Sequence, residues 1–283
     1  MTALATRIGE VREAVRSARR RGERIGLVPT MGALHEGHLS LIRAARAETE
    51  FVVVSIFVNP TQFGPGEDLA KYPRPHEQDL AACRQADVNL VFAPSEAEMY
   101  AAEGATTVRV KGLTETMCGR TRPGHFDGVA TVVAKLLNIA QPDLVYLGEK
   151  DAQQLAVLRR MVRDLDFPVE VRACPLVRDA DGLALSSRNT YLSPDERQRA
   201  LALGRTLAEA REAILAGQRD AAAIAEAVRQ RLGQTDGLEL EYAVVVDPDT
   251  LGGLTTIGEQ ALVAVAAKVG QTRLIDNVLV RGL

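Results

Sequence analysis

The chain has 283 residues, of which 46% are hydrophobic and 25% charged, which is typical of a globular protein with a substantial core. Its 34 basic and 37 acidic residues give a formal net charge of −3, so we expect neither a nucleic-acid nor a membrane partner. No apolar run approaches the roughly 20 residues that span a bilayer. Residues 1–26 are rich in Arg but also contain Glu, unlike a secretory signal or a transit peptide. Three widely spaced cysteines without metal-type spacing favour reduced thiols, so we expect a cytoplasmic protein.

Strands and helices alternate through the first part of the chain. Apolar periodicity predicts, in order, a helix near 8–18, strand 24–30, helix 38–50, strands 51–58 and 87–94, helix 129–140, strand 142–150, helix 151–165 and strand 169–177. The run 51–58 is almost continuously apolar, as in a strand buried on both faces. This order predicts an α/β fold with a doubly wound (Rossmann-like) parallel sheet, in a domain of residues 1–177.

The pattern changes in residues 178–283. Ser193 with Pro194 and Glu196 forms a capping-box sequence that opens a helix, and Gly217 follows its end. A second helix is predicted near 220–232, and three strands follow at 240–248, 261–270 and 272–280. We therefore expect a smaller α+β C-terminal domain.

The first polar cluster is "PTMGALHEGHLSL", residues 29–41, between a strand and a helix that we expect to begin near His38. Ligands of open parallel sheets bind at the carboxyl ends of the strands, and a helix N-terminus attracts anions. His35 and His38 would add donors toward the same anion, which favours phosphate over a metal ion; a purely structural loop is the remaining alternative. Met31 either lines this pocket or belongs to the core.

Two further clusters follow predicted strands. The long Pro/Gly-rich loop 58–75 begins with Asn59 and Gln62, which can hydrogen-bond a small polar substrate, although Asn59–Pro60 can also simply begin a turn. In "YLGEKDAQQL" (146–155), Lys150 stands where it can neutralise a phosphate, but a lysine near a helix start is usually inert.

Asp151 in the same segment is a candidate N-cap, and Gln154 falls in the first turn of the following helix. The fourth cluster, "LSSRN" (185–189), places two hydroxyls beside a guanidinium, which complements phosphate oxygens. The alternative is a solvated loop.

Taken together, these clusters resemble one enzyme family. The motifs "PTMGALHEGH", "SIFVNPTQF", "YPR", "RPGHFDGV", "GEKDAQQL" and "LSSRN" occur in this order, and "EYAVVVDPDTL" fits near the C-terminus. The chain resembles the pantothenate synthetase (pantoate–β-alanine ligase) family of the HxGH nucleotidyltransferase superfamily. HxGH alone is shared with other adenylyltransferases and class I aminoacyl-tRNA synthetases, whereas the full set is strongly specific.

The resemblance implies ATP-dependent condensation of (R)-pantoate with β-alanine to pantothenate through a pantoyl-adenylate intermediate, with release of AMP and pyrophosphate. It also implies Mg²⁺ with the ATP, small-molecule partners only, and a homodimer. The family's catalytic roles fall on His35, His38, Lys150, Ser187 and Arg188. Its ATP-binding roles fall on Met31, His38, Gly148, Lys150, Asp151, Val177, Ser186, Ser187 and Arg188. Its pantoate-binding roles fall on Met31, Asn59, Gln62 and Gln154, and Asp79 is a weaker candidate for the surroundings of the metal.

Two positions depart from the family pattern. Leu147 and Ala152 stand where aromatic residues are expected, which affects the shape of the pocket but removes no polar group. Three rival functions are another HxGH adenylyltransferase, a non-catalytic nucleotide-binding protein, and an RNA-binding synthetase relative. The intact polar motifs and the net charge of −3 disfavour them.

Overall fold

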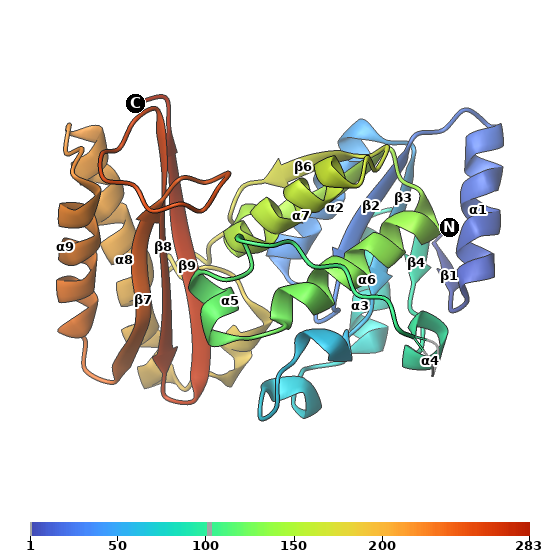
Figure 1. Cartoon of the computed structure of the whole chain (residues 1–283). Coiled ribbons are helices and arrows are strands. Elements are labelled where there is room, and N and C mark those ends of the chain that lie inside the picture. Colours follow the sequence, from blue (N-terminus) through green and yellow to red (C-terminus); the bar gives the residue numbers. More distant parts are fainter. Residues whose placement is uncertain (1, 101–103) are drawn as a thin grey trace. The chain divides into compact units, whose positions relative to one another are not determined.

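The computed structural model describes residues 2–100 and 104–283, and the chain divides into two compact units (Figure 1). The first unit contains Met1–Glu149 and Val157–Pro175, and the second contains Lys150–Ala156 and Leu176–Leu283. The short segment Lys150–Ala156 therefore groups with the C-terminal part of the chain. The functions expected for domains 1–177 and 178–283 stay predictions.

The first unit is built on a parallel sheet, as the sequence predicted. Its strands are β1 (Ala3–Ala5), β2 (Ile25–Thr30), β3 (Phe51–Ile56), β4 (Leu90–Phe92), β5 (Leu144–Gly148) and β6 (Glu170–Cys174). They are arranged in the order β1-β4-β3-β2-β5-β6 with every pair parallel. Strand β1 was not predicted, because three residues at a sheet edge are too few to show a period.

Helices pack on both faces of this sheet (Figure 1). Up to β6 the chain forms α1 (Ile8–Arg20), α2 (Glu36–Glu48), α3 (His76–Gln85), α4 (Glu96–Met99), α5 (Met117–Thr121), α6 (His125–Ala140) and α7 (Ala152–Asp164). Of these, α1, α2 and α6 contact the strands most closely, and the first turn of α7 belongs to the second unit. Val52 and Val54 of β3 pack in one core cluster with α2 and α3, whereas Val53 points the opposite way and is also buried. The apolar run 51–58 thus reflects a strand covered on both sides.

The sheet has its topological switch point between β2 and β5. From β2 the chain continues through α2 to β3 on one side, and from β5 it continues through α7 to β6 on the other. The carboxyl ends of β2 and β5, at Thr30 and Gly148, therefore flank the crevice where such sheets bind ligands. The polar clusters that follow β2 and β5 therefore begin at the carboxyl ends of two neighbouring strands.

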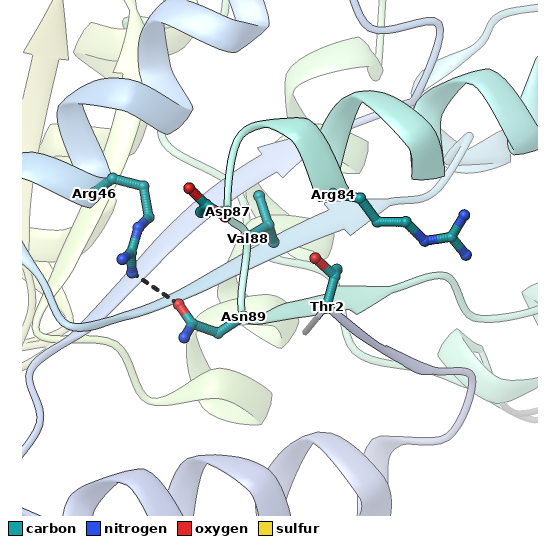
Figure 2. A pocket seen from close by; sticks show the side chains of 6 residues that line it. All are labelled: Thr2, Arg46, Arg84, Asp87, Val88 and Asn89. Atoms are coloured by element: carbon teal, nitrogen blue, oxygen red, sulfur yellow. Dashed lines mark hydrogen bonds between the residues drawn. The ribbon is translucent and has the colours of Figure 1, made fainter.

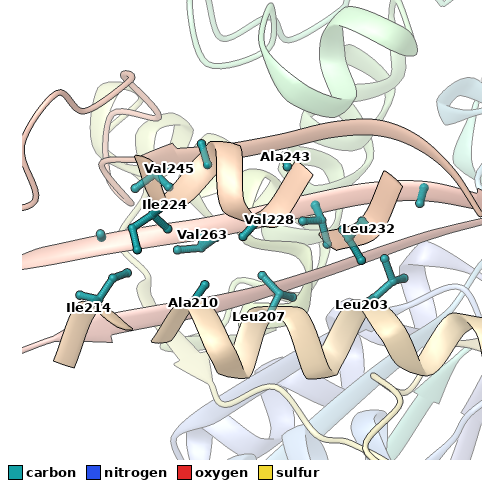
Figure 3. Close-up of a cluster of buried hydrophobic side chains, with 14 of the residues drawn as sticks. Leu203, Leu207, Ala210, Ile214, Ile224, Val228, Leu232, Ala243, Val245 and Val263 are labelled. Atoms are coloured by element: carbon teal, nitrogen blue, oxygen red, sulfur yellow. The ribbon is translucent and has the colours of Figure 1, made fainter. Parts of the chain in front are cut away.

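The second unit is an antiparallel sheet with two long helices. It contains α8 (Pro194–Leu215), α9 (Ala221–Gly233), β7 (Leu238–Val246), β8 (Gln260–Val269) and β9 (Thr272–Arg281), with strand order β7-β8-β9. Leu203, Leu207 and Ile214 recur along one face of α8 and face Val228 of α9 and Val263 of β8 in the core (Figure 3).

The predicted start and end of α8 are confirmed. The Ser193 hydroxyl accepts the N–H of Glu196 at 3.3 Å, and the Glu196 carboxylate accepts the N–H of Ser193 at 2.8 Å. Gly217, just beyond the helix, has a φ of +104°. Within residues 2–100 and 104–283, no helix combines the length and apolar character needed to cross a bilayer.

Candidate active site

The turn after β2 is shaped by a buried carboxylate. Gly32 and Ala33 have φ values of +84° and +51°, and the Asp79 carboxylate of α3 accepts the N–H groups of Ala33 at 2.9 Å and Leu34 at 2.7 Å. A Cβ on Gly32 would lie 2.9 Å from Asp79 Oδ2, so glycine is needed both for its φ and for this close approach. Asp79 is 2% exposed. It therefore holds the segment that leads into His35.

A role for Asp79 near Mg²⁺ stays a prediction. Both of its carboxylate oxygens already accept main-chain N–H groups. Across the part of the chain that the structure describes, no group of three or more His, Cys, Asp or Glu is arranged to hold a metal ion. A metal that enters with ATP would need few protein ligands, because Mg²⁺ commonly uses phosphate oxygens and water with one or two carboxylates.

His35 and His38 form the N-terminal cap of α2. The helix begins at Glu36, two residues before the expected start at His38, with His35 as its N-cap. His35 Nδ1 accepts the N–H of Gly37 at 3.2 Å, and His38 Nδ1 accepts the N–H of His35 at 3.3 Å. The expected start was wrong because Ser, Thr, Asn and Asp are the usual capping residues, and here a histidine takes that place.

This capping box decides which ring nitrogen of each histidine carries the proton. Nδ1 of His35 and Nδ1 of His38 each accept a main-chain N–H, so neither Nδ1 atom carries a proton. The proton of each neutral ring is therefore assigned to Nε2. The two ring centroids lie 4.1 Å apart. The first turn of α2 thus combines two Nε2–H donors with the partial positive charge of a helix N-terminus, which suits an anion.

Three of the predicted pantoate-binding residues are in contact beside the carboxyl ends of the adjacent strands β2 and β3. Asn59 Nδ2 donates to Gln62 Oε1 at 3.1 Å, and Gln62 Nε2 lies 3.0 Å from the sulfur of Met31. Asn59 is 1% exposed and its side-chain oxygen accepts the Tyr100 hydroxyl at 2.7 Å. Asn59 also caps the 3₁₀ turn η1 (Pro60–Gln62), so the turn-forming alternative holds as well. Its side chain orients that of Gln62.

Arg122 and His125 of the motif "RPGHFDGV" hold the main chain at Gln62. His125 Nδ1 lies 2.8 Å from the carbonyl oxygen of Gln62, and Arg122 lies 3.0 Å from His125 Nε2. Arginine can only donate, so Nε2 is the acceptor and the His125 proton is on Nδ1. The sequence alone assigned this motif no role, because the contact crosses about 60 residues of chain.

Arg122 also binds the long loop after β3 through Glu67. The two side chains form a bidentate pair at 2.6 and 2.7 Å. Burial raises the pKa of Glu67, but the hydrogen bonds and charge of Arg122 outweigh it and hold that pKa below its ordinary value. Gly128 allows α6 to approach the same loop, since a Cβ there would lie 2.3 Å from the carbonyl oxygen of Thr61.

Lys150 follows the end of β5 and lies in the second unit. Its ammonium group is 3.6 Å from Asp151 Oδ1, and its main-chain oxygen accepts the side-chain N–H of Asn277 at 2.9 Å. Asp151 ends the 3₁₀ turn η3 (Glu149–Asp151), and half-buried Gln154 lies in the first turn of α7. The main chain of Lys150 is therefore held by Asn277, and its ammonium group lies near the carboxylate of Asp151.

Residues 186–188 are ordered by a short hairpin and a 3₁₀ turn. The carbonyl oxygen of Val177 accepts the N–H of Leu185 at 3.1 Å, and the Ser186 hydroxyl accepts the N–H of Arg188 at 3.3 Å to cap η4 (Ser187–Tyr191). Ser186, Ser187 and Arg188 are all half-buried, so this segment is not a fully solvated loop.

The structure thus forms two groups of predicted residues, one in each unit. Met31, Asn59 and Gln62, together with His35 and His38, follow the adjacent strands β2 and β3 in the first unit, where Gly148 ends β5. The second unit contains Lys150, Asp151, Gln154, Val177, Ser186, Ser187 and Arg188. Of the two departures from the family pattern, Leu147 is buried within β5 and Ala152 begins α7.

A pocket of the first unit lies at the amino ends of strands β1 and β4, whereas the predicted site residues follow the carboxyl ends of strands (Figure 2). Thr2 and Asn89, which line it, directly precede β1 and β4, and Arg46 Nη1 donates to Asn89 Oδ1 at 3.0 Å. None of the predicted site residues lines this pocket. We assign it no part in the chemistry.

Comparison with known proteins gives one consistent family. A family model described as pantoate-beta-alanine ligase matches residues 3–279. A pantothenate synthetase of Moorella thermoacetica is 55% identical over 272 residues, 96% of each chain, and one of Thermoanaerobacter sp. is 53% identical over 273 residues, again 96% of each. A crystal structure of pantothenate synthetase from Thermus thermophilus superposes with a TM-score of 0.93 at 48% identity and covers 98% of both chains. A pantoate-beta-alanine ligase from Francisella tularensis, complexed with beta-gamma ATP and beta-alanine, has a TM-score of 0.80 at 33% identity and covers 99% of this chain and 98% of that one.

Proposed function

Because the chain belongs to the pantoate–β-alanine ligase family, we infer that it joins (R)-pantoate to β-alanine with ATP to form pantothenate. The reaction passes through pantoyl adenylate and releases pyrophosphate in the first step and AMP in the second. The observation that carries the assignment of the site is the capping box of α2, in which His35 and His38 each have Nε2–H as donor at a helix N-terminus.

The first step needs positioning and charge stabilisation, and no nucleophilic side chain. The carboxylate of pantoate is already ionised and attacks the α-phosphorus of ATP, while the bond to pyrophosphate breaks. His35 and His38 donate to phosphate oxygens, which gain negative charge as pyrophosphate leaves. Because Nδ1 of both rings is held by the main chain, each donor is aligned before ATP binds.

The remaining nucleotide contacts are assigned through the family. Lys150 contacts the α-phosphate, and Ser187 and Arg188 bind the triphosphate with the help of Ser186. Gly148, Asp151, Met31 and Val177 accommodate the adenosine. Mg²⁺ enters with ATP and neutralises phosphate charge when bound, and Asp79 is the candidate carboxylate in its surroundings.

Pantoate is held by side-chain amides. Gln62 and Gln154 hydrogen-bond its polar groups, and Met31 lines the pocket. Asn59 acts through Gln62, because its amide already serves Gln62 Oε1 and the carbonyl oxygen of Gly128. In the second step the amine of β-alanine attacks the carbonyl carbon of pantoyl adenylate, and the bond to AMP breaks.

One experiment tests the reaction. Purified protein is incubated with ATP, Mg²⁺, D-pantoate and β-alanine, and AMP is measured while each substrate is omitted in turn. AMP release that depends on both pantoate and β-alanine is expected. AMP release that does not depend on pantoate would refute the proposed function.

A second experiment tests the role of His35 and keeps the N-cap of α2. In His35→Asn the side-chain oxygen can still accept the N–H of Gly37, but the donor at the Nε2 position is lost. We expect pantoyl-adenylate formation to fall at least a hundredfold, corresponding to about 2.7–4 kcal/mol for one positioned donor, with an unchanged melting temperature. His76→Asn, at an exposed histidine that begins α3, is the matched control. Near-normal adenylation by His35→Asn would remove His35 from the site.

We place the enzyme in the cytoplasm as a homodimer, as the family resemblance implies. Cys83, Cys118 and Cys174 are buried and form no disulfide, which suits a reducing compartment. Light scattering on the purified protein measures the oligomeric state, and a molar mass of one chain at micromolar concentration would refute the dimer.

A further inference from the structure

Two segments that carry proposed nucleotide-binding groups are attached to the same edge strand. Strand β9 lies at the edge of the β7-β8-β9 sheet, and both Lys150 and the hairpin before Ser186 form hydrogen bonds with it. The partners on β9 are the consecutive residues Asp276 and Asn277. All these residues belong to the second unit.

Asn277 holds the main chain of Lys150. Its Nδ2 donates to the carbonyl oxygen of Lys150 at 2.9 Å, and Asn277 is only 6% exposed. Buried hydrogen bonds of this kind fix the direction of a main-chain segment, because leaving either partner unpaired in the interior is costly. The main chain from which the Lys150 side chain extends is therefore fixed to β9.

Asp276 holds the hairpin that leads into Ser186. Its carboxylate receives two hydrogen bonds from the Arg178 guanidinium, at 2.7 Å to Oδ2 and 2.9 Å to Oδ1, and it is 2% exposed. Arg178 also donates to the carbonyl oxygen of Gly182 at 3.1 Å and thus closes the hairpin on itself. Burial raises the pKa of Asp276, and Arg178 and the N–H of Asn277 oppose this by stabilising the carboxylate.

The hairpin is also fixed from its other side by α8. Arg197 binds Asp179 at 2.6 Å and Asp181 at 2.9 Å, near the turn. Gly204 of α8 allows close packing, since a Cβ there would lie 2.8 Å from the carbonyl oxygen of Gly182. The turn η4, which contains Ser187 and Arg188, contacts β9 directly. The position of the hairpin is therefore set by β9 and α8 together.

The alternation of a β-strand explains how two neighbouring residues serve two segments. Successive side chains of a strand point to opposite faces of the sheet. Asp276 shares its face with Leu274 and Val280, which belong to the core packed on α8, and Asn277 points to the other face, where it meets Lys150. One peptide unit of β9 thus connects both segments at a fixed spacing.

We propose that Asp276 and Asn277 are positioning residues for adenylate formation, with Asn277 acting through Lys150 and Asp276 acting through Arg178 on Ser186–Arg188. This inference rests on the proposed function of Lys150, Ser187 and Arg188 as phosphate-binding groups. In this role Asp276 and Asn277 act only through the residues that they hold. They keep the charges of the two segments in register with each other, and displacement of such groups by about 1 Å can lower a rate roughly a hundredfold.

The test separates positioning from general stability. Asn277→Ala removes the hydrogen bond to Lys150 without placing a new charge, and Asp276→Asn weakens the pair with Arg178. The matched control is Glu241→Gln, because Glu241 forms a similar bidentate pair with Arg273 of β9, at 2.7 and 2.8 Å, but holds no proposed catalytic segment. For each variant, kcat and KM for ATP and pantoate are measured by pantoate-dependent ATP–pyrophosphate exchange, together with thermal unfolding.

We expect Asn277→Ala to lower kcat about tenfold to a hundredfold with KM for pantoate within about twofold of wild type. Asp276→Asn should raise KM for ATP as well, since it acts on the triphosphate-binding segment. Glu241→Gln should keep the wild-type kcat. A wild-type kcat in Asn277→Ala, or an equal loss in Asn277→Ala and Glu241→Gln, would overturn the proposal. If Asp276→Asn does not fold, Asn277→Ala alone decides.

The outcome also distinguishes this inference from the proposed function on which it rests. Absence of pantoate-dependent exchange in the wild-type protein refutes the function. Wild-type exchange that survives Lys150→Ala removes Lys150 from the site and with it the role of Asn277. Exchange that is lost in Lys150→Ala but retained in full by Asn277→Ala refutes the positioning role alone.

Discussion

The replacement Asp79→Asn separates two roles for this carboxylate, the structural role seen in the turn after β2 and the predicted role near Mg²⁺. The carboxylate accepts the N–H groups of Ala33 and Leu34 at 2.9 and 2.7 Å. Asparagine keeps one acceptor but turns its NH₂ group toward the other main-chain N–H, so one hydrogen bond is lost and a donor is left facing a donor.

The size of the effect follows from these two bonds. A hydrogen bond to a charged group contributes about 1.5–3 kcal/mol, and its neutral replacement contributes about 1 kcal/mol. One bond is lost and the other becomes neutral, so we expect Asp79→Asn to lower the free energy of unfolding by about 2–5 kcal/mol. That change corresponds to a fall in melting temperature of roughly 4–20 °C for a unit of this size. Because Ala33 and Leu34 lead directly into His35, adenylation should also slow.

The assay is thermal unfolding combined with adenylation measured over a range of Mg²⁺ concentrations. Glu77→Gln is the control, since Glu77 also lies in the first turn of α3 but is exposed, so it reports the loss of a negative charge at that helix end alone. We expect a similar Mg²⁺ requirement in Asp79→Asn and wild type. A wild-type melting temperature together with a raised Mg²⁺ requirement would refute the structural reasoning and support the metal role.

Three further predictions concern the first unit. Gly128→Ala should reduce both stability and affinity for pantoate, because its Cβ would lie 2.3 Å from the Thr61 carbonyl oxygen, and unfolding together with KM for pantoate measure this. Cys83, whose pKa burial raises to about 12, should resist alkylation at about pH 8 until the protein unfolds, as mass spectrometry can follow. The lowered pKa of Glu67 means that its pair with Arg122 adds stability above the unfolded-state pKa and that this stability is lost as the pH falls through the folded-state pKa. Glu67→Gln should therefore unfold with a weaker dependence on pH in the acid range.

Each of these has a contrary outcome. A Gly128→Ala protein with wild-type stability would mean that α6 can retreat from the loop at no cost. Rapid alkylation of Cys83 in the folded protein would mean that its part of the core opens readily. An unaltered acid transition in Glu67→Gln would mean that folding does not lower the pKa of Glu67.

The regular parts of the fold were predictable because they repeat a local pattern. The buried run 51–58 and the capping box at Ser193 each indicate their structure within a few residues. By contrast, α3 (His76–Gln85) was missed, because it buries only a narrow stripe that includes the polar residue Asp79. Charged and polar residues in that stretch obscure the helical period.

The candidate site residues follow from sequence motifs and stay predictions, whereas the contacts that hold their side chains could not be read from the sequence. His35 and His38 were predicted as anion-binding donors. The arrangement that fixes their protons depends on His35 being the N-cap of α2, and histidine is not one of the usual capping residues. The link from Arg122 to Gln62 joins residues 60 apart, and the link from Asp79 to Ala33 joins residues 46 apart. Such contacts depend on the finished tertiary structure, so no local pattern encodes them.

The grouping of Lys150–Ala156 with the C-terminal part has a consequence for dissecting the protein. The chain passes between its two units three times, after Glu149, after Ala156 and after Pro175. A fragment that begins at Leu176 would therefore be incomplete, since the side chain of Asn277 would lose the Lys150 carbonyl oxygen as its acceptor. The two units are therefore not modules that a single proteolytic cut could release intact, and a cut after Pro175 would separate Lys150 from Asn277.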